Sequence, residues 1–216
     1  MEYVSLEERI MKECNDQAKE YLIKNGTNGL INLFTALSEN TANEMMDFLK
    51  TGRKNTSMDL LLCIIPLVLK NGKSFETKKT ICSIKSIKPD ISNKDLFDCL
   101  ILFSYMFDLF YGTNLEDTLE NVNSLNEDCI NLLNVSDIPK LEKNNIDTAK
   151  TDYNSIIVLK DYIKSLKTNY EDYDYSSPTS KAIIYFLRGI NNVKSINNDV
   201  IEKKYGAIIQ KFLLSI

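Results

Sequence analysis

The longest stretch of large apolar residues lies near the middle of the chain, between Asp90 and Gly112. From Leu96 to Tyr111, only Asp98, Ser104 and Asp108 interrupt this stretch. Such a run is too long for one buried strand and is typical of a helix that other helices surround. We therefore expect a central core helix at about residues 92–111, and a bundle built around it.

Local signals mark both ends of this helix. Ser92 can cap its free N–H groups, with Asp95 as the reciprocal partner of a capping box. Gly112 follows the last apolar residues and is suited to end the helix. The helix boundaries are therefore predicted from neighbouring residues alone.

One polar stripe runs along the same segment. On a helical wheel Lys94, Asp98, Tyr105 and Asp108 fall close together, which predicts the single solvent-facing line of the helix and an ion pair between Lys94 and Asp98. Asp98 and Asp108 are about 15 Å apart along the helix axis, which is too far for a glycosidase pair of carboxylates. The stripe therefore does not predict an active site.

Helical periodicity and capping signals predict further helices on both sides of the central one. We expect them at about residues 5–23, 30–37, 41–50, 58–69, 75–87, 152–166, 177–188 and 199–214, with two short helices after the capping boxes at 113–116 and 124–127. Asn25 and Gly26 should end the first of them, and Pro66 should kink the helix at 58–69. No alternating strand pattern or internal repeat is present, so the predicted fold class is all-α, a compact bundle of about ten helices.

The predicted domain organisation is simple, because 216 residues are enough for one well-packed domain. Residues 1–135 form the main helical domain, and residues 151–216 are C-terminal helices that pack on it. Residues 136–150 are polar, contain Pro139 and lack periodicity, which predicts a mobile linker.

Composition and charge limit the location and the partners. The net charge of −4 gives no basic footprint for nucleic acid. The apolar run is shorter than the ~20 residues of a membrane span, so no membrane is expected. Five widely spaced cysteines without a Cys-x-x-Cys pair indicate free thiols and no disulfides. Together with a charged first segment, they predict a cytoplasmic, intracellular protein.

Several common chemistries are missing from the chain. It has no histidine, which excludes Ser-His-Asp and Cys-His catalysis and histidine-ligated metals. Its seven glycines form neither of the familiar phosphate-binding loops. The richness in Asn, Ile and Lys matches AT-rich genomes, including those of some viruses and phages. These observations favour a protein without enzymatic activity and without a cofactor.

An acidic, tyrosine-rich segment precedes the helix at 177–188. Asp172 and Asp174 could bind Mg²⁺ through their carboxylates, whereas the alternative is a solvated loop. Tyr170, Tyr173 and Tyr175 alternate with these acids and are candidate partner-binding residues, because tyrosine is enriched at protein interfaces.

A second candidate lies on the helix at 41–50, where an apolar stripe is followed by a basic turn. Met45, Met46, Phe48, Leu49 and Arg53 could grip a partner, because methionine side chains adapt to apolar grooves. The alternative is that this stripe packs in the core, which is the usual fate of apolar residues at helical spacing.

Three segments together resemble one known family. Gly52-Arg53-Lys54-Asn55 leads into the apolar helix with Pro66, the central helix ends in FYGTNLEDTLENV, and YNSIIVLKDYIKSL precedes the acidic turn. This order is similar to the ADP-ribosylglycohydrolases over roughly two-thirds of the chain, through hydrophobic spacing. That family is all-α and holds two Mg²⁺ ions through a Thr-Asp-Asp-Thr motif and an Asp-x-Asp-Thr/Ser motif.

The chain departs from both motifs of that family. It has no counterpart of the first, and Asp172-Tyr-Asp174-Tyr175 matches the second in part. The resemblance therefore implies a catalytically inactive or divergent relative that binds an ADP-ribose-type ligand with Mg²⁺.

The sequence favours a non-enzymatic helical protein that acts by binding another protein, for example a viral or phage factor that binds a host protein. Any helix-sized groove is expected on the short helices before Asn55. The Mg²⁺-dependent relative is the alternative, and assembly into a homo-oligomer is the third hypothesis.

Overall fold

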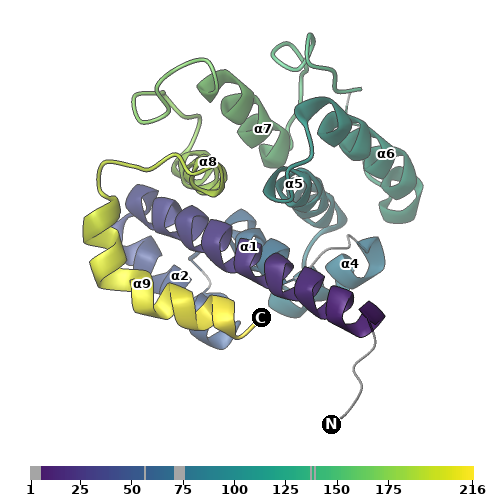
Figure 1. Cartoon of the computed structure of the whole chain (residues 1–216). Coiled ribbons are helices and arrows are strands. Elements are labelled where there is room, and N and C mark those ends of the chain that lie inside the picture. The colour runs from purple at the N-terminus through teal and green to yellow at the C-terminus, as the bar shows by residue number, and fades with distance from the viewer. Residues whose placement is uncertain (1–5, 56, 71–75, 137, 139) are drawn as a thin grey trace.

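A computed structural model describes residues 6–55, 57–70, 76–136, 138 and 140–216, and the side chains of these residues except those at 6–14 and 131. In this part of the chain there are nine α-helices, one 3₁₀ helix and no strand, which confirms the all-α prediction (Figure 1). The elements in order are α1 (Leu6–Ala36), α2 (Glu39–Thr51), η1 (Leu60–Cys63), α3 (Ile64–Lys70), α4 (Thr77–Ile87), α5 (Asn93–Phe110), α6 (Leu115–Leu133), α7 (Asn154–Ser165), α8 (Pro178–Ile190) and α9 (Asn198–Leu214).

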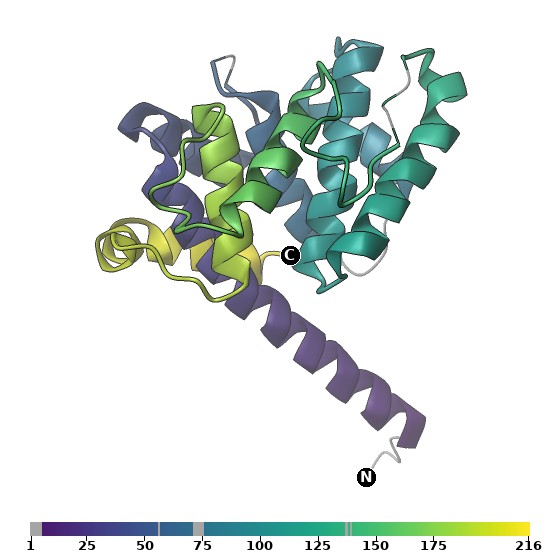
Figure 2. The same cartoon turned by 90° about the horizontal axis from the view of Figure 1, so that it is seen from above.

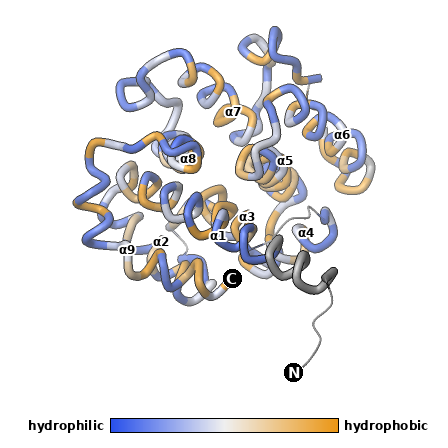
Figure 3. The backbone as a smooth tube through the Cα atoms, in the orientation of Figure 1, coloured by the Kyte–Doolittle hydropathy of each residue, from blue (hydrophilic) through white to orange (hydrophobic). Residues whose placement is uncertain are grey.

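Helix α5 is the predicted central helix, and both of its ends are confirmed. The Ser92 hydroxyl accepts a hydrogen bond from the Asp95 N–H at 3.0 Å. Gly112 adopts a left-handed conformation with φ of 84°, and the Thr113 N–H donates to the Asp108 carbonyl at 2.9 Å. This pattern is the Schellman ending that glycine favours. Apolar residues dominate α5, which is coloured largely as hydrophobic in Figure 3, and most of them are buried.

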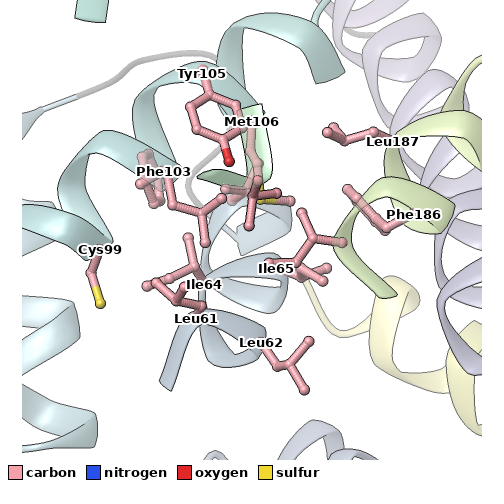
Figure 4. Packing of buried hydrophobic residues seen from close by; sticks show 14 of the residues in the cluster. Leu61, Leu62, Ile64, Ile65, Cys99, Phe103, Tyr105, Met106, Phe186 and Leu187 are labelled. Carbon is pink, nitrogen blue, oxygen red and sulfur yellow. The ribbon is translucent and has the colours of Figure 1, made fainter. Parts of the chain in front are cut away.

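The core forms where α5 meets α3 and α8 (Figure 4). Ile64 and Ile65 at the start of α3 are fully buried, and they lie near Phe103 and Met106 of α5 and Phe186 of α8. Because α8 is far from α3 and α5 in sequence, this contact joins the C-terminal helices to the middle of the chain in one core.

The predicted helix at 58–69 is divided into two elements shortly before its proline. Residues Leu60–Cys63 form the 3₁₀ helix η1, and α3 begins at Ile64. Pro66 therefore lies in the first turn of α3, where its missing N–H is not needed. The expected kink is instead a change from a 3₁₀ helix to an α-helix.

Helix α1 continues through Asn25 and Gly26, so the prediction that it ends there is wrong. The reason is packing: α1 lies against Leu213 of α9 and Leu69 of α3 at Gly26 itself, and against α8 one turn later. A Cβ atom on Gly29 would lie 2.7 Å from the Phe186 ring, and one on Gly189 would lie 2.5 Å from the Asn28 carbonyl oxygen. Both glycines let the two helix backbones approach each other closely, which explains glycine within a helix.

The first turns of α1 project away from the other helices (Figure 2). Where α1 reaches the body, the Tyr21 hydroxyl donates to the Phe110 carbonyl at 2.7 Å, and its ring packs edge-on against the Phe110 ring. Tyr21 is nevertheless 41% exposed. Ser5 and Phe75, where two predicted helices begin, lie outside the described residues.

Helix α6 replaces the two short helices predicted after residue 113, and that prediction is wrong. Asn114 caps α6, because its side chain accepts from the Asp117 N–H at 3.0 Å. Ser124, the start of the second capping box, lies inside the helix. The buried face formed by Val122 and Leu125 runs through this point, so packing favours one continuous helix.

The predicted solvent-facing stripe of α5 is wrong for its two middle members. Asp98 is 7% exposed and Tyr105 is fully buried, because α7 packs over them. The Asp98 carboxylate accepts from the Asn154 N–H at 3.0 Å, the Ser155 N–H at 2.8 Å and the Ser155 hydroxyl. The Tyr105 hydroxyl donates to the Ser155 carbonyl at 3.0 Å. The stripe therefore binds the first turn of α7 instead of water.

Burial changes the ionisation of this stripe. Desolvation raises the pKa of Asp98, although its hydrogen bonds from residues 154 and 155 oppose that rise. Lys94 is exposed and pairs with Asp152 at 2.7 Å, so the predicted pair with Asp98 does not form. Asp108, at the far end, is half-buried.

The segment 136–150 contains no regular α-helix among its described residues, but side chains of α6 hold it. The Asn123 amide exchanges two hydrogen bonds with the Leu141 backbone, each at 2.9 Å, and Asn126 does the same with Ile138 at 3.2 and 3.3 Å. Ile138 and Leu141 are buried. The mobility of this segment stays a prediction.

Two sequence expectations about composition can be compared with the described residues. Four cysteines are free, and three of them are buried, namely Cys63, Cys99 and Cys129. Across the described helices, none combines the length and the apolar character that a bilayer crossing needs.

The contact between α1 and α8 predicts a strong effect of one methyl group. Gly189→Ala should lower the free energy of unfolding by about 1–3 kcal/mol, because the new Cβ atom collides with backbone atoms of α1. Gly206→Ala in α9 is the matched control, since its Cβ would make only an ordinary contact at 3.6 Å with Glu202. It should raise stability by about 0.5–1 kcal/mol. Urea unfolding followed by circular dichroism measures both, and equal effects would contradict the close approach.

The capping of α7 predicts an unequal effect of two neighbouring carboxylates. Asp98→Ala should destabilise the protein by about 2–4 kcal/mol, because three donors, two of them buried, lose their acceptor. Asp95→Ala removes an exposed carboxylate from the first turn of the same helix and should cost below about 1 kcal/mol. Urea unfolding at neutral pH compares them. Similar losses for both variants would mean that Asp98 does not hold α7.

Candidate functional site

The acidic segment suggested for Mg²⁺ lies between α7 and α8. Asp172 and Asp174 are both exposed, and the Asp172 carboxylate accepts from the Asn169 side chain at 2.7 Å. Within the described part of the chain, no three histidine, cysteine or acidic side chains converge as metal ligands. Both carboxylates therefore face solvent, and the Mg²⁺ site stays a prediction.

The tyrosines of this segment pack against α8. Tyr170 is 3% exposed, and its ring lies edge-on to the Tyr185 ring with centroids 4.9 Å apart. The Arg188 guanidinium lies 5.3 Å from the centre of the Tyr170 ring, and burial raises the pKa of Tyr170 to about 12. Tyr173 and Tyr175 are half-buried. The three tyrosines therefore bury part of their surface within the chain itself.

A buried carboxylate of α7 holds this segment in place. Asp161 is 4% exposed and accepts from the Ser176 N–H and hydroxyl, both at 2.9 Å, and from the Ser180 hydroxyl at 2.6 Å. Ser176 lies just before α8, and Ser180 lies in its first turn. Asp161 thus joins α7 to α8 in the way that Asp98 joins α5 to α7.

The apolar stripe suggested as a partner-binding face lies mostly in the core. Met45 is fully buried, and Phe48 and Leu49 are 5% and 6% exposed. Met46 is partly buried, and Arg53 is exposed. The structure therefore agrees with the core-packing interpretation of this stripe, whose helix α2 packs beside α9 (Figure 1).

An apolar groove lies between α2 and α9. Its volume is about 320 Å³, and it is lined by Leu49, Lys50, Ile208, Lys211, Phe212 and Ser215. Leu49 is the one predicted site residue in this lining. The sequence did not identify Ile208, Lys211 and Phe212 as site residues, because helical periodicity alone does not show which side of α9 is covered. The available signal was Lys211, which stands beside apolar residues near the end of α9.

The charge around this groove is positive. Leu49 and Phe212 are buried and form its floor, whereas Lys50 and Lys211 are exposed at its edge. Lys50 pairs with Asp47 at 3.8 Å, and Lys211 forms no ion pair with a described residue. The Lys70 ammonium lies 5.3 Å from the centre of the Phe212 ring. No acidic residue lines the groove.

Comparisons with family models, with curated proteins and with solved structures find no match to this chain. The likeness to ADP-ribosylglycohydrolases therefore stays a prediction from hydrophobic spacing.

The anchoring of the tyrosine segment predicts a contrast between two of its acids. Asp161→Ala should destabilise the protein by about 2–4 kcal/mol and increase the solvent exposure of tyrosines, because three donors at the start of α8 lose their acceptor. Asp174→Ala removes an exposed carboxylate and should change stability by less than about 0.5 kcal/mol. Urea unfolding and second-derivative tyrosine absorbance measure the two effects. An unchanged tyrosine spectrum in Asp161→Ala would contradict the anchoring role.

Proposed function

We propose that this chain acts by binding another protein, and that the groove between α2 and α9 is the binding site. The partner is a helical segment that presents one large apolar side chain flanked by Asp or Glu. The observation that carries this proposal is the apolar floor formed by Leu49 and Phe212 beneath a rim of lysines.

The size of the groove favours side chains of a partner over a whole cofactor. Its volume of about 320 Å³ is at the lower end of the range for small-molecule pockets. Interfaces commonly place one or two anchor side chains in a pocket of this kind, and these anchors supply most of the binding energy. Full burial of one Leu or Phe contributes about 1.5–3 kcal/mol.

The lysines determine which partner suits the groove. The whole chain carries a net charge of −4, so this basic rim is a local exception. Lys211 has no acidic partner among the described residues and can pair with a carboxylate of the bound segment. Such complementary charges speed association and exclude basic partners.

The two competing hypotheses predict different ligands. A divergent ADP-ribosylglycohydrolase would bind ADP-ribose and Mg²⁺ through Asp172 and Asp174, which lie on the loop before α8 and not in the groove. Self-assembly would place a second copy in the groove. Neither hypothesis has an observation of its own comparable to the basic rim.

Peptide binding tests the proposal directly. The probe is a fluorescein-labelled amphipathic helical peptide with a central Leu or Phe and flanking Glu residues, and its partner probe has Lys at the flanking positions. The acidic peptide should bind in fluorescence anisotropy, and Lys211→Glu should weaken it about tenfold by reversing the charge at the rim. Lys203→Glu makes the same charge change on α9 outside the groove and should have little effect.

Four results would overturn the proposal. The first is equal binding of the acidic and basic peptides, and the second is an equal loss in Lys211→Glu and Lys203→Glu. The third is tight, Asp174-dependent binding of ADP-ribose with Mg²⁺ in calorimetry, which would establish the competing function. A stable dimer that Lys211→Glu dissociates would assign the groove to a second copy of this chain.

A further inference from the structure

A second hollow of about 320 Å³ lies where α4, α5 and α6 meet. Two carboxylates line it, Asp108 and Asp128, together with the side-chain amide of Asn121. Among the residues that the structure describes, no lysine or arginine is part of the lining. Neither carboxylate forms an ion pair with a described residue, so their negative charge has no cationic partner in this part of the chain.

A buried hydroxyl opens into the same hollow. Ser104 of α5 is 4% exposed, and it is part of the lining. Buried hydroxyls are normally hydrogen-bonded, and a serine within a helix commonly donates to a carbonyl of the preceding turn. The Ser104 hydroxyl forms no such bond with any described residue, unlike Ser83 of α4, which donates to the Lys79 carbonyl. It is therefore available to a guest in the hollow.

The environment of Asp108 also favours a positive guest. This carboxylate is half-buried and accepts from the Asn121 side chain at 2.8 Å. Burial raises the pKa of Asp108, and the nearby negative charge of Asp117 raises it further. A cation placed beside Asp108 would relieve both effects, because it compensates the charge that burial disfavours.

The chemistry of the lining selects the kind of cation. A hard divalent ion takes six or more oxygen ligands, and no group of three acidic ligands converges among the described residues. An organic ammonium needs only hydrogen-bond acceptors around each charged end. The lining offers these at Asp108 and Asp128, and the side chain of Leu125 lies in the same lining as apolar surface for methylene groups.

We propose that the hollow between α4, α5 and α6 is a binding site for a small aliphatic polyamine. One ammonium group donates to the Asp108 carboxylate and the Ser104 hydroxyl, and a second ammonium group donates to Asp128. The intervening methylene groups contact Leu125. This site is separate from the groove between α2 and α9, because the two linings share no residue.

Calorimetry of the full chain with spermidine and with putrescine tests this site. The salt concentration is about 0.15 M, because salt screens the unspecific attraction between polyamines and an acidic protein. Wild-type protein should bind spermidine and should not bind 1,4-butanediol, the neutral counterpart of putrescine. Asp108→Asn should weaken spermidine binding about tenfold through the loss of one charge-assisted hydrogen bond. Ser104→Ala should weaken it several-fold, at about the worth of a neutral hydrogen bond.

The matched control is Asp95→Asn, which removes the same charge from the first turn of α5, about 20 Å from Asp108 along the helix and outside the lining. It should leave spermidine affinity within about twofold of wild type. Three results would overturn the proposal: equal losses in Asp108→Asn and Asp95→Asn, comparable binding of 1,4-butanediol, or no heat at millimolar spermidine with folded wild-type protein. A circular dichroism spectrum of each variant shows that it is folded.

Discussion

Buried carboxylates are the constraint on which the arrangement of the C-terminal helices depends. A carboxylate removed from water needs donors, and N–H groups and hydroxyls near the start of a following helix supply them. Asp98 of α5 accepts from the first two N–H groups of α7, and Asp161 of α7 accepts from Ser176 just before α8 and from the Ser180 hydroxyl in its first turn. The central helix thus holds α7, and α7 holds the start of α8.

The second constraint is the close approach of α1 and α8. Gly29 and Gly189 face each other, and no side chain fits between them. The approach brings Phe186 and Leu187 of α8 into the core beside α3 and α5 (Figure 4). The same long α1 also carries α9, which in turn lies against α2. Packing around α1 therefore places α2 and α9 on either side of the groove, although Gly29 and Gly189 lie in α1 and α8.

The two proposed binding surfaces differ in chemistry because they are formed by different kinds of helix face. The groove lies where the apolar sides of α2 and α9 meet incompletely, which leaves Leu49 and Phe212 beneath the lysine rim. The hollow lies where polar residues of α5 and α6 meet, which places Ser104 and Asp108 in its lining with no cationic side chain among the described lining residues. An apolar floor suits a side chain of a protein partner, whereas the carboxylates suit a small cation.

Features that depend on neighbouring residues were predictable from the sequence. The central helix, its cap at Ser92, its ending at Gly112 and the start of α8 at Ser177-Pro178 all follow from periodicity and capping preferences, and the structure confirms them. The all-α class follows from the same signals. These features need no knowledge of which segments meet in space.

The tertiary structure alone decided the features that depend on distant partners. Asp98 carries a charge and Tyr105 a hydroxyl, and the docking of α7 buries both. Asn25 and Gly26 are ordinary helix-ending residues, and the packing of α1 on α8 and α9 keeps the helix continuous. Lys211 of α9 becomes part of a groove only through α2, about 160 residues earlier in the chain. A one-dimensional pattern records which residues are apolar, but the partner that covers each of them is chosen by three-dimensional packing.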